Sequence, residues 1–160
     1  MIYLLLGLAV CAASSAAVLI RLCDAPALVV AAYRLGIAAC VVLPLSLMRC
    51  GNPLRNVSGR DRLALVSSGV FLGFHFAFWI SSLSHTSVAS SVLLVTTSPI
   101  FLGLGGWLLF RERVNWRTGV GIVVSLVGTA VVTVNDWGIG RHAFSGDVLA
   151  LGGALAISGH

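Results

Sequence analysis

Long uncharged apolar runs alternate with short basic segments along this chain. The run from Thr86 to Phe110 holds 25 residues without a charged side chain, which is enough to cross a hydrocarbon core of about 30 Å at about 1.5 Å per helical residue. Runs of this kind predict an all-α polytopic membrane protein. The expected spans cover residues 2–20, 27–48, 63–83, 87–110 and 118–134.

A polar loop, residues 135–146, separates the fifth span from another apolar segment. This last segment, residues 147–160, is too short to cross a bilayer, so we interpret it as the truncated start of a sixth helix and the chain as a fragment. Its sequence from Leu149 to Ala154 matches Leu4 to Ala9 at four of six positions. Because five spans precede it, a second copy of the unit would enter the membrane from the opposite side, which predicts an inverted repeat.

The composition supports a membrane protein, since 58% of the residues are hydrophobic and only 9% are charged. The mean hydropathy of +1.03 lies outside the range of soluble globular domains. The net charge of +5 comes from ten arginines against five acidic residues, with no lysine. Because the arginines cluster between apolar runs, the charge bias of cytoplasmic loops explains them, and we expect no nucleic-acid partner.

The same arginines predict how the chain is oriented in the membrane. Seven of them lie in two loops on one side: Arg49, Arg55, Arg60, Arg62, Arg111, Arg113 and Arg117. The opposite side has only Arg21 and Arg141, partly balanced by acidic neighbours. This asymmetry predicts that the N-terminus and both basic loops are cytoplasmic. Glu112 is then expected to form a salt bridge at a cytoplasmic helix end.

Arg34 is the sharpest candidate for function, because it lies inside the second span. A central arginine costs about 2.5–3.5 kcal/mol to insert, and no complete span holds an acidic residue to pair with it. One interpretation is that Arg34 faces a wet cavity and attracts a carboxylate or phosphate on a substrate. The other is that its long side chain reaches the interface near Pro26, about 12 Å away along the helix. The sequence leaves both open.

The third span carries two distinct patterns beside its phenylalanines. Small residues recur every four positions and predict a stripe for helix packing: Gly69, Gly73, Ala77 and Ser81. His75 and Trp79, also four apart, form a polar and aromatic face that suits the wall of a cavity for amphipathic solutes. His75 is in addition a candidate proton site, against the simpler alternative of a histidine hydrogen-bonded between helices. In the fifth span, Gly121 and Ser125 repeat the small-residue spacing and predict packing alone.

The fourth span has hydroxyl groups and a proline at its centre. Pro99 lacks an N–H, so the carbonyl of Val95 loses its helical partner and the helix is expected to kink. Freed carbonyls and hydroxyls suit a transport pathway, and hydroxyls bonded back to their own helix are the open alternative. The candidate pathway residues are therefore Arg34, His75, Trp79, Ser91, Thr97, Ser98 and Pro99.

No pattern in the chain points to catalysis. The four cysteines lack metal-ligand spacing, and there is no HExxH motif, paired intramembrane carboxylates or glycine loop for a phosphate. We therefore expect a protein that is not an enzyme and that uses no cofactor and no metal.

Three stretches together match the pattern of a known family. They are Ala31–Leu45, with an arginine early in the second helix; Ser87–Val132, with a mid-helix proline and a glutamate closing the fourth helix; and Gly146–His160. These stretches resemble the EamA-domain family of the drug/metabolite transporter superfamily. The resemblance implies ten helices in two inverted five-helix repeats, which usually export amino acids, metabolites or drugs across the bacterial inner membrane.

Residues 1–134 are then the first of these repeats. The partners implied are the lipid bilayer, a small-molecule substrate, and a missing C-terminal repeat or a second copy of the chain. The sequence thus predicts a secondary transporter, an exporter of small metabolites, amino acids or drugs that works by alternating access about a cavity lined by the second to fourth spans. The alternative is a non-transporting membrane subunit or helix-packing module, with the fragment inactive alone.

Overall fold

The computed structural model describes residues 2–50, 57–111, 115–136 and 141–160. Within these residues the chain is helical apart from short connections, and no strand is present. The helices are α1 (Ile2–Leu22), α2 (Ala27–Cys50), α3 (Gly59–Leu83), α4 (Val88–Val95), α5 (Ser98–Phe110), α6 (Trp116–Asp136) and α7 (Arg141–Ser158). The predicted all-α class is confirmed.

Four helical stretches are long and apolar enough to cross a membrane: Ile2–Leu22, Ala27–Arg49, Gly59–Leu83 and Val88–Leu108. Most large apolar side chains of α1 and α2 are exposed, as expected for helices whose outer faces meet lipid. The described part of the chain also has two shorter apolar helices, Trp116–Val131 and Ala143–Ser158. A multi-pass membrane protein is therefore confirmed, while a fifth span at 118–134 stays a prediction.

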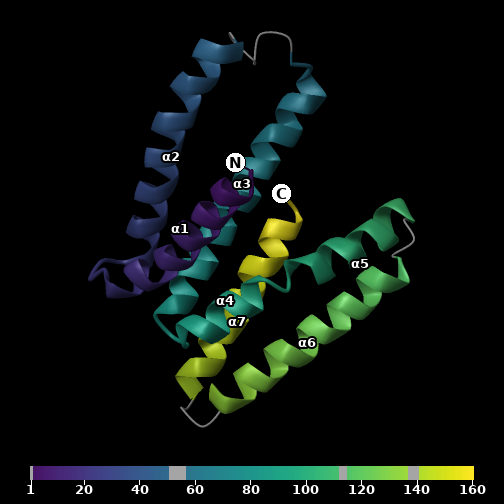
Figure 1. The fold of residues 1–160 in the computed structure, drawn as a ribbon. Helices are drawn as coiled ribbons and strands as arrows, with labels where there is room; N and C mark the ends of the chain where they lie inside the picture. The colour runs from purple at the N-terminus through teal and green to yellow at the C-terminus, as the bar shows by residue number, and fades with distance from the viewer. Residues whose placement is uncertain (1, 51–56, 112–114, 137–140) are drawn as a thin grey trace.

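The helices form two arms that meet near the middle of the molecule (Figure 1). In the upper arm α2 packs against α3, and in the other arm α5 continues outward from α4 while α6 runs back and packs against α4. α7 lies where the arms meet and packs against α3, α4 and α5. Its buried positions are mostly alanines, which let a helix approach its neighbours closely: Ala143, Ala150, Ala154 and Ala156.

α7 begins at Arg141, so the last part of the loop expected at 135–146 is helical. The helix is stabilised there by contact with the turn between α3 and α4. A β-carbon added at Gly146 would lie 2.7 Å from the backbone nitrogen of Thr86, so the two backbones approach as closely as a glycine permits. Because most of the stability of a helix in a protein comes from such packing, the polar composition of this segment does not prevent helix formation.

The span expected at 87–110 is two helices, α4 and α5, interrupted at Thr96 and Thr97. The Thr97 N–H donates to the Leu94 carbonyl at 3.2 Å instead of reaching Leu93, so the α-helical ladder ends there. The Thr96 hydroxyl donates to the Leu93 carbonyl at 2.7 Å, and the Thr97 hydroxyl donates to Leu94 at 2.6 Å. The interruption thus lies just before Pro99, and hydroxyl groups satisfy carbonyls that it frees.

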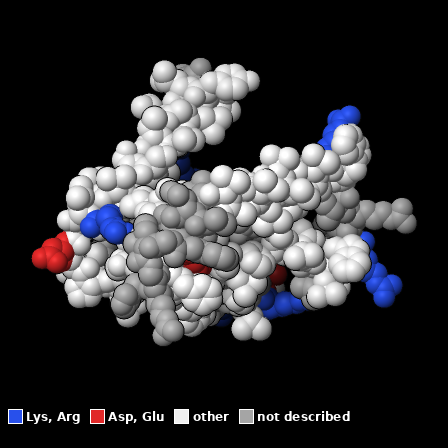
Figure 2. Space-filling model, turned by 90° about the horizontal axis from the view of Figure 1, so that it is seen from below, with Lys and Arg blue, Asp and Glu red and all other residues white. Residues whose placement is uncertain are grey.

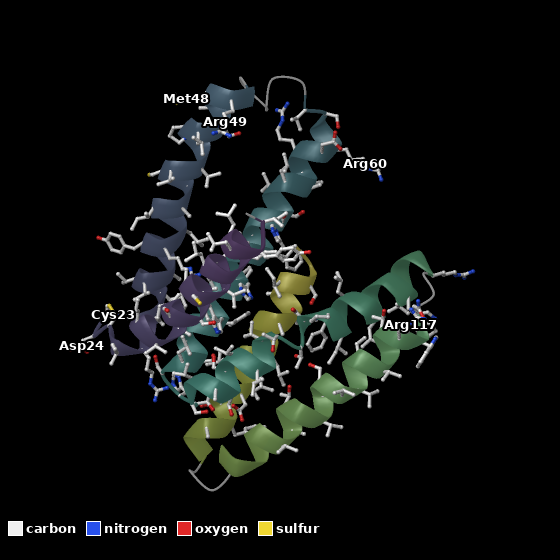
Figure 3. All side chains as sticks on the ribbon, viewed as in Figure 1. Cys23, Asp24, Met48, Arg49, Arg60 and Arg117 are labelled. Carbon is white, nitrogen blue, oxygen red and sulfur yellow. The ribbon has the colours of Figure 1, made fainter. Side chains whose placement is uncertain are left out.

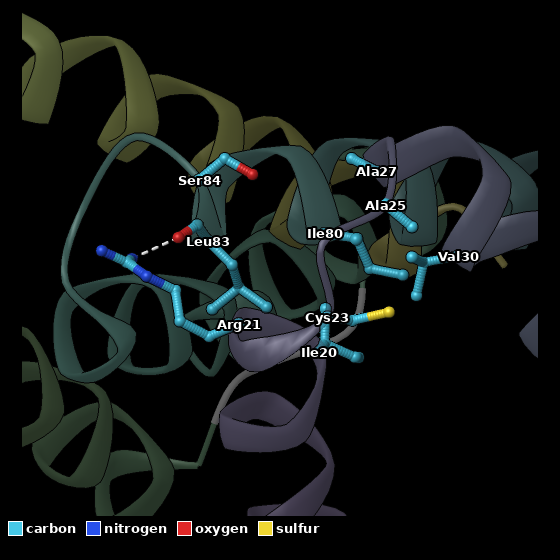
Figure 4. A pocket seen from close by; sticks show the side chains of 9 residues that line it. All are labelled: Ile20, Arg21, Cys23, Ala25, Ala27, Val30, Ile80, Leu83 and Ser84. Atoms are coloured by element: carbon cyan, nitrogen blue, oxygen red, sulfur yellow. Dashed lines mark hydrogen bonds between the residues drawn. The ribbon is translucent and has the colours of Figure 1, made fainter.

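Arg21, in the last turn of α1, connects this helix to the end of α3 and to the turn before α4. Its guanidinium donates to the carbonyls of Leu83 and Thr86, at the end of α3 and in the turn to α4. Figure 4 shows Arg21 beside Leu83, at the edge of a small cavity of about 190 Å³. The Thr86 hydroxyl in turn donates to Asp147 of α7 at 2.8 Å. This junction therefore links the ends of α1 and α3 to the start of α7.

Candidate functional site

A cavity of about 680 Å³ opens between α1, α2, α3 and α4. Its walls are mostly apolar side chains, and its polar lining residues are Ser14, Arg34, His75, Trp79 and Thr96. We refer to it as the α1–α4 cavity. Its volume and its mixture of a large apolar surface with a few polar groups are typical of a site for a small organic molecule.

Arg34 extends from α2 over two aromatic rings of α3. Its guanidinium carbon lies 4.9 Å from the centre of the Phe76 ring and 5.4 Å from the centre of the Trp79 ring. Such cation–π contacts stabilise a partly desolvated arginine by about 0.5–2 kcal/mol. Within the described residues Arg34 has no hydrogen bond and no ion pair. The rings therefore hold the guanidinium in place, while its N–H groups stay available to a ligand.

His75 connects the cavity wall to α7. Its Nδ1 lies 2.8 Å from the carbonyl oxygen of Gly153, and its ring stacks on Trp79 at 6.2 Å with an interplanar angle of 12°. Because a carbonyl only accepts, Nδ1 carries the proton, and in the neutral form of the ring Nε2 is an acceptor. His75 is thus hydrogen-bonded between helices α3 and α7, which is the simpler of the two alternatives for this residue. It also lines the α1–α4 cavity.

Trp79 is nearly as enclosed as His75, with 9% of its surface exposed against 8% for His75. Its indole Nε1 is buried and has no hydrogen-bond partner among the described residues. A buried donor without a partner costs about 1–3 kcal/mol, and such groups occur where a ligand or water completes the site. Arg34 of α2 and His75 and Trp79 of α3 thus all line the α1–α4 cavity.

Residues 1–134 match the model of the EamA-like transporter family. The chain belongs to this family. It is similar to "Uncharacterized transporter YxxF" of Bacillus subtilis (strain 168), with 30% identity over 76 residues, or 48% of the chain and 24% of the relative. It is also similar to "Uncharacterized transporter YetK" of the same organism, with 28% identity over 93 residues, or 55% of the chain and 27% of the relative.

The chain thus matches about a quarter of the length of these two curated relatives. No solved structure matches it. Membership in this family confirms the resemblance noted in the sequence and makes a membrane transporter the general class of this EamA-like protein. The part of the chain that matches the family model includes every residue that lines the α1–α4 cavity, whereas α7 lies beyond it.

The other candidate pathway residues of this EamA-like protein lie outside the cavity wall. Ser91 is fully buried and shares a hydrogen bond of 2.6 Å with Ser82, which joins α4 to α3. The Ser98 carbonyl accepts a hydrogen bond of 3.0 Å from Ser158 of α7. Thr97 and Pro99 line a separate cavity of about 320 Å³ beside α6. Their place in a pathway stays a prediction.

The residues expected to pack helices are also placed apart from the α1–α4 cavity. A methyl group added at Gly69, Gly73 or Gly121 would meet no atom within 4 Å. Ala77 is half-buried, whereas Ser125 is exposed. Glu112 lies outside the described residues. These packing roles stay predictions.

Two features that matter in the structure were not singled out in the sequence. Phe76 lies under Arg34, three residues before Trp79, and the helical period alone places these two rings on neighbouring parts of α3. Gly146, Ala150 and Ala154 are buried in α7 and repeat every four residues. That repeat is the small-residue signal for close helix packing, and it could have identified the docking face of α7.

Proposed function

We propose that this EamA-like protein acts in secondary transport of small solutes across the bacterial inner membrane, and that the solute binds in the α1–α4 cavity. The observation that carries the proposal is Arg34, which is held over Phe76 and Trp79 at the wall of a 680 Å³ cavity without an acidic partner in the described residues. An arginine inside an apolar helix is costly, and a transported ligand gives it a partner.

The direction and mechanism belong to the same proposal. We infer export by alternating access, as is usual for the family that the sequence resembles. We place the N-terminus in the cytoplasm, because arginines are concentrated around the α2–α3 and α5–α6 connections. A second repeat, from a longer chain or from a second copy of this one, would complete the pathway on the open side of the α1–α4 cavity. The greater length of the matched relatives supports such a partner.

Flux measurements in proteoliposomes test the function. Radiolabelled amino acids, organic acids and drug-like solutes are screened for counterflow by the protein with its second repeat present. Arg34→Ala and Trp79→Ala are expected to lower the flux of the transported solute by about tenfold or more, because each removes a charged or buried group at the ligand. Arg49→Ala and Trp107→Ala are matched controls on α2 and α5, at exposed positions, and should retain flux.

Two results would count against the proposal. Normal flux in both Arg34→Ala and Trp79→Ala would remove the site from the α1–α4 cavity. Absence of flux for every solute, with correctly inserted protein, would favour the alternative of a non-transporting membrane subunit or helix-packing module.

A further inference from the structure

The α1–α4 cavity is lined by one positively charged side chain and by no negatively charged one. Arg34 is the one lining residue with a formal charge, and none of the lining residues is acidic. The acidic side chains that the structure describes do not line the cavity: they lie in the α1–α2 turn, in the first turn of α3, and in α7 beside Thr86. Arg34 is half-buried, and a partly desolvated charge is more stable when it is paired, so the cavity has one positive charge to match with one negative charge on a ligand.

The polar donors of the cavity are close to each other. The guanidinium of Arg34 lies 5.4 Å from the centre of the Trp79 ring, and the indole Nε1 of Trp79 is a buried donor without a partner in the described part of the chain. A guanidinium presents two parallel N–H groups that match the two oxygens of a carboxylate. Trp79 lines the same cavity, so its indole N–H is a candidate for a third donor. This wall therefore suits an acceptor with a single negative charge.

Most of the remaining cavity lining is apolar. Val88 and Val92 of α4 face it together with Ala13 and Ala17 of α1. These side chains provide contact for a hydrocarbon or aromatic body, and no acidic side chain among the lining residues would pair with an ammonium group. A zwitterionic amino acid would leave one positive charge unpaired, and a dianionic phosphate would leave one negative charge unpaired.

We propose that the α1–α4 cavity selects small organic monoanions, namely carboxylates with an uncharged apolar body, and that Arg34 and the Trp79 indole N–H hold the carboxylate. The proposal rests on the transport function proposed above and specifies the substrate class of that same site. The carboxylate replaces water on Arg34 and satisfies the unpaired donor of Trp79, while the apolar body lies along α1 and α4.

Binding of matched probes tests the selectivity. Isothermal titration with the protein in lipid nanodiscs compares 3-phenylpropionate with 3-phenylpropanamide, which lacks the charge, and with phenylalanine, which adds an ammonium group. A second pair, hexanoate and hexanamide, removes the aromatic ring. Each carboxylate is expected to bind about tenfold or more tightly than its amide, and 3-phenylpropionate more tightly than phenylalanine, because a hydrogen-bonded charge pair forms only with the monoanion.

Variants assign the preference to residues. Arg34→Gln should leave 3-phenylpropionate and its amide with equal affinity, whereas Arg49→Gln, at the exposed far end of α2, should keep the wild-type difference. Trp79→Phe keeps a ring beneath the guanidinium but removes the indole N–H, so it should weaken the carboxylate selectively. Trp107→Phe on α5 is its matched control, since Trp107 is exposed.

The selectivity of the wild-type protein needs no variant and therefore does not depend on how Arg34→Gln folds. Equal binding of carboxylate and amide, tighter binding of phenylalanine, no binding of either carboxylate at millimolar concentration, or an unchanged preference in Arg34→Gln would each overturn the proposal. These binding results are independent of the flux measurements. If the protein transports a zwitterion or a neutral solute, only the proposed substrate class is disproved. Carboxylate-selective binding without counterflow of any solute disproves the transport function alone.

Discussion

Gly146 decides how closely α7 approaches the turn between α3 and α4. At this point the α7 backbone lies against Thr86 and His85, and an added β-carbon would be 2.7 Å from the Thr86 nitrogen and 2.9 Å from the His85 carbonyl carbon. The neighbouring Asp147 accepts the Thr86 hydroxyl at 2.8 Å, and the Thr86 carbonyl accepts from Arg21. A single residue without a side chain thus permits contacts that involve α1, α3 and α7.

Gly146→Ala is expected to destabilise the protein by about 1–3 kcal/mol, because the methyl group would overlap backbone atoms that cannot move aside easily. Thermal unfolding in detergent, followed by circular dichroism, measures the change. Gly121→Ala in α6 is the matched control. It adds a methyl group in open space and should leave the unfolding temperature unchanged or raise it slightly, since alanine favours a helix over glycine. Equal stability of the two variants would contradict close packing of α7.

The interruption between α4 and α5 is the main irregular element inside an apolar stretch. Thr96 and Thr97 bond back to the carbonyls of Leu93 and Leu94, so the hydroxyl groups serve their own helix. The first bond of α5 runs from the Ile100 N–H to the Thr97 carbonyl at 2.9 Å. Pro99 cannot donate to Val95, which prevents the ladder from continuing through this point. A local chemical cause therefore explains why one expected span is two helices.

Pro99→Ala is expected to straighten this stretch, because alanine supplies the N–H that can bond to the Val95 carbonyl. Spin labels at the exposed positions Ala89 and Leu108, in a cysteine-free background, would report the change by pulsed electron resonance. The distance between them should increase towards that of a continuous helix, about 28 Å between the two backbones. Ile100→Ala keeps the proline and should keep the original distance. An unchanged distance in Pro99→Ala would show that tertiary packing, and not the proline, causes the interruption.

At the scale of the whole molecule, charged side chains are few and widely separated. Figure 3 shows Arg49 and Arg60 together at one end of the upper arm, with Cys23 and Asp24 near its other end and Arg117 at the tip of the second arm. Seen from below, the protein surface is mostly uncharged (Figure 2). This distribution suits a molecule whose long sides face lipid and whose charged groups lie at the two membrane surfaces.

The proposed orientation predicts which cysteines react on each side of the membrane. In cells that express single-cysteine variants, a membrane-impermeant maleimide should label Cys23, in the exposed α1–α2 turn, from outside the inner membrane. Arg60→Cys, near the start of α3, should react only after the membrane is permeabilised, because the α2–α3 connection is then cytoplasmic. Cys40, inside the second candidate span, is the negative control for both conditions. Labelling of Arg60→Cys but not of Cys23 in intact cells would reverse the orientation.

The sequence alone determined the class of the protein and the approximate limits of its apolar helices. Hydropathy and helical period depend on neighbouring residues, so α1, α2 and α3 lie close to the expected ranges. The same local reasoning placed His75 and Trp79 on one face of α3 and identified Arg34 as a costly charge. It also located the irregularity of the fourth span, because the lack of an N–H at Pro99 is a property of the residue itself.

Only the tertiary structure decided which of these residues meet. His75 and Gly153 are 78 residues apart in the chain, and Thr86 and Asp147 are 61 residues apart. Contacts of this kind depend on how whole helices pack, which a local pattern does not contain. The position of Arg34 over Phe76, the separation of Ser98 from the α1–α4 cavity and the docking of α7 all follow from that packing. Apolar runs determine that helices form in a membrane, while the shapes and small side chains of facing helices determine where they touch.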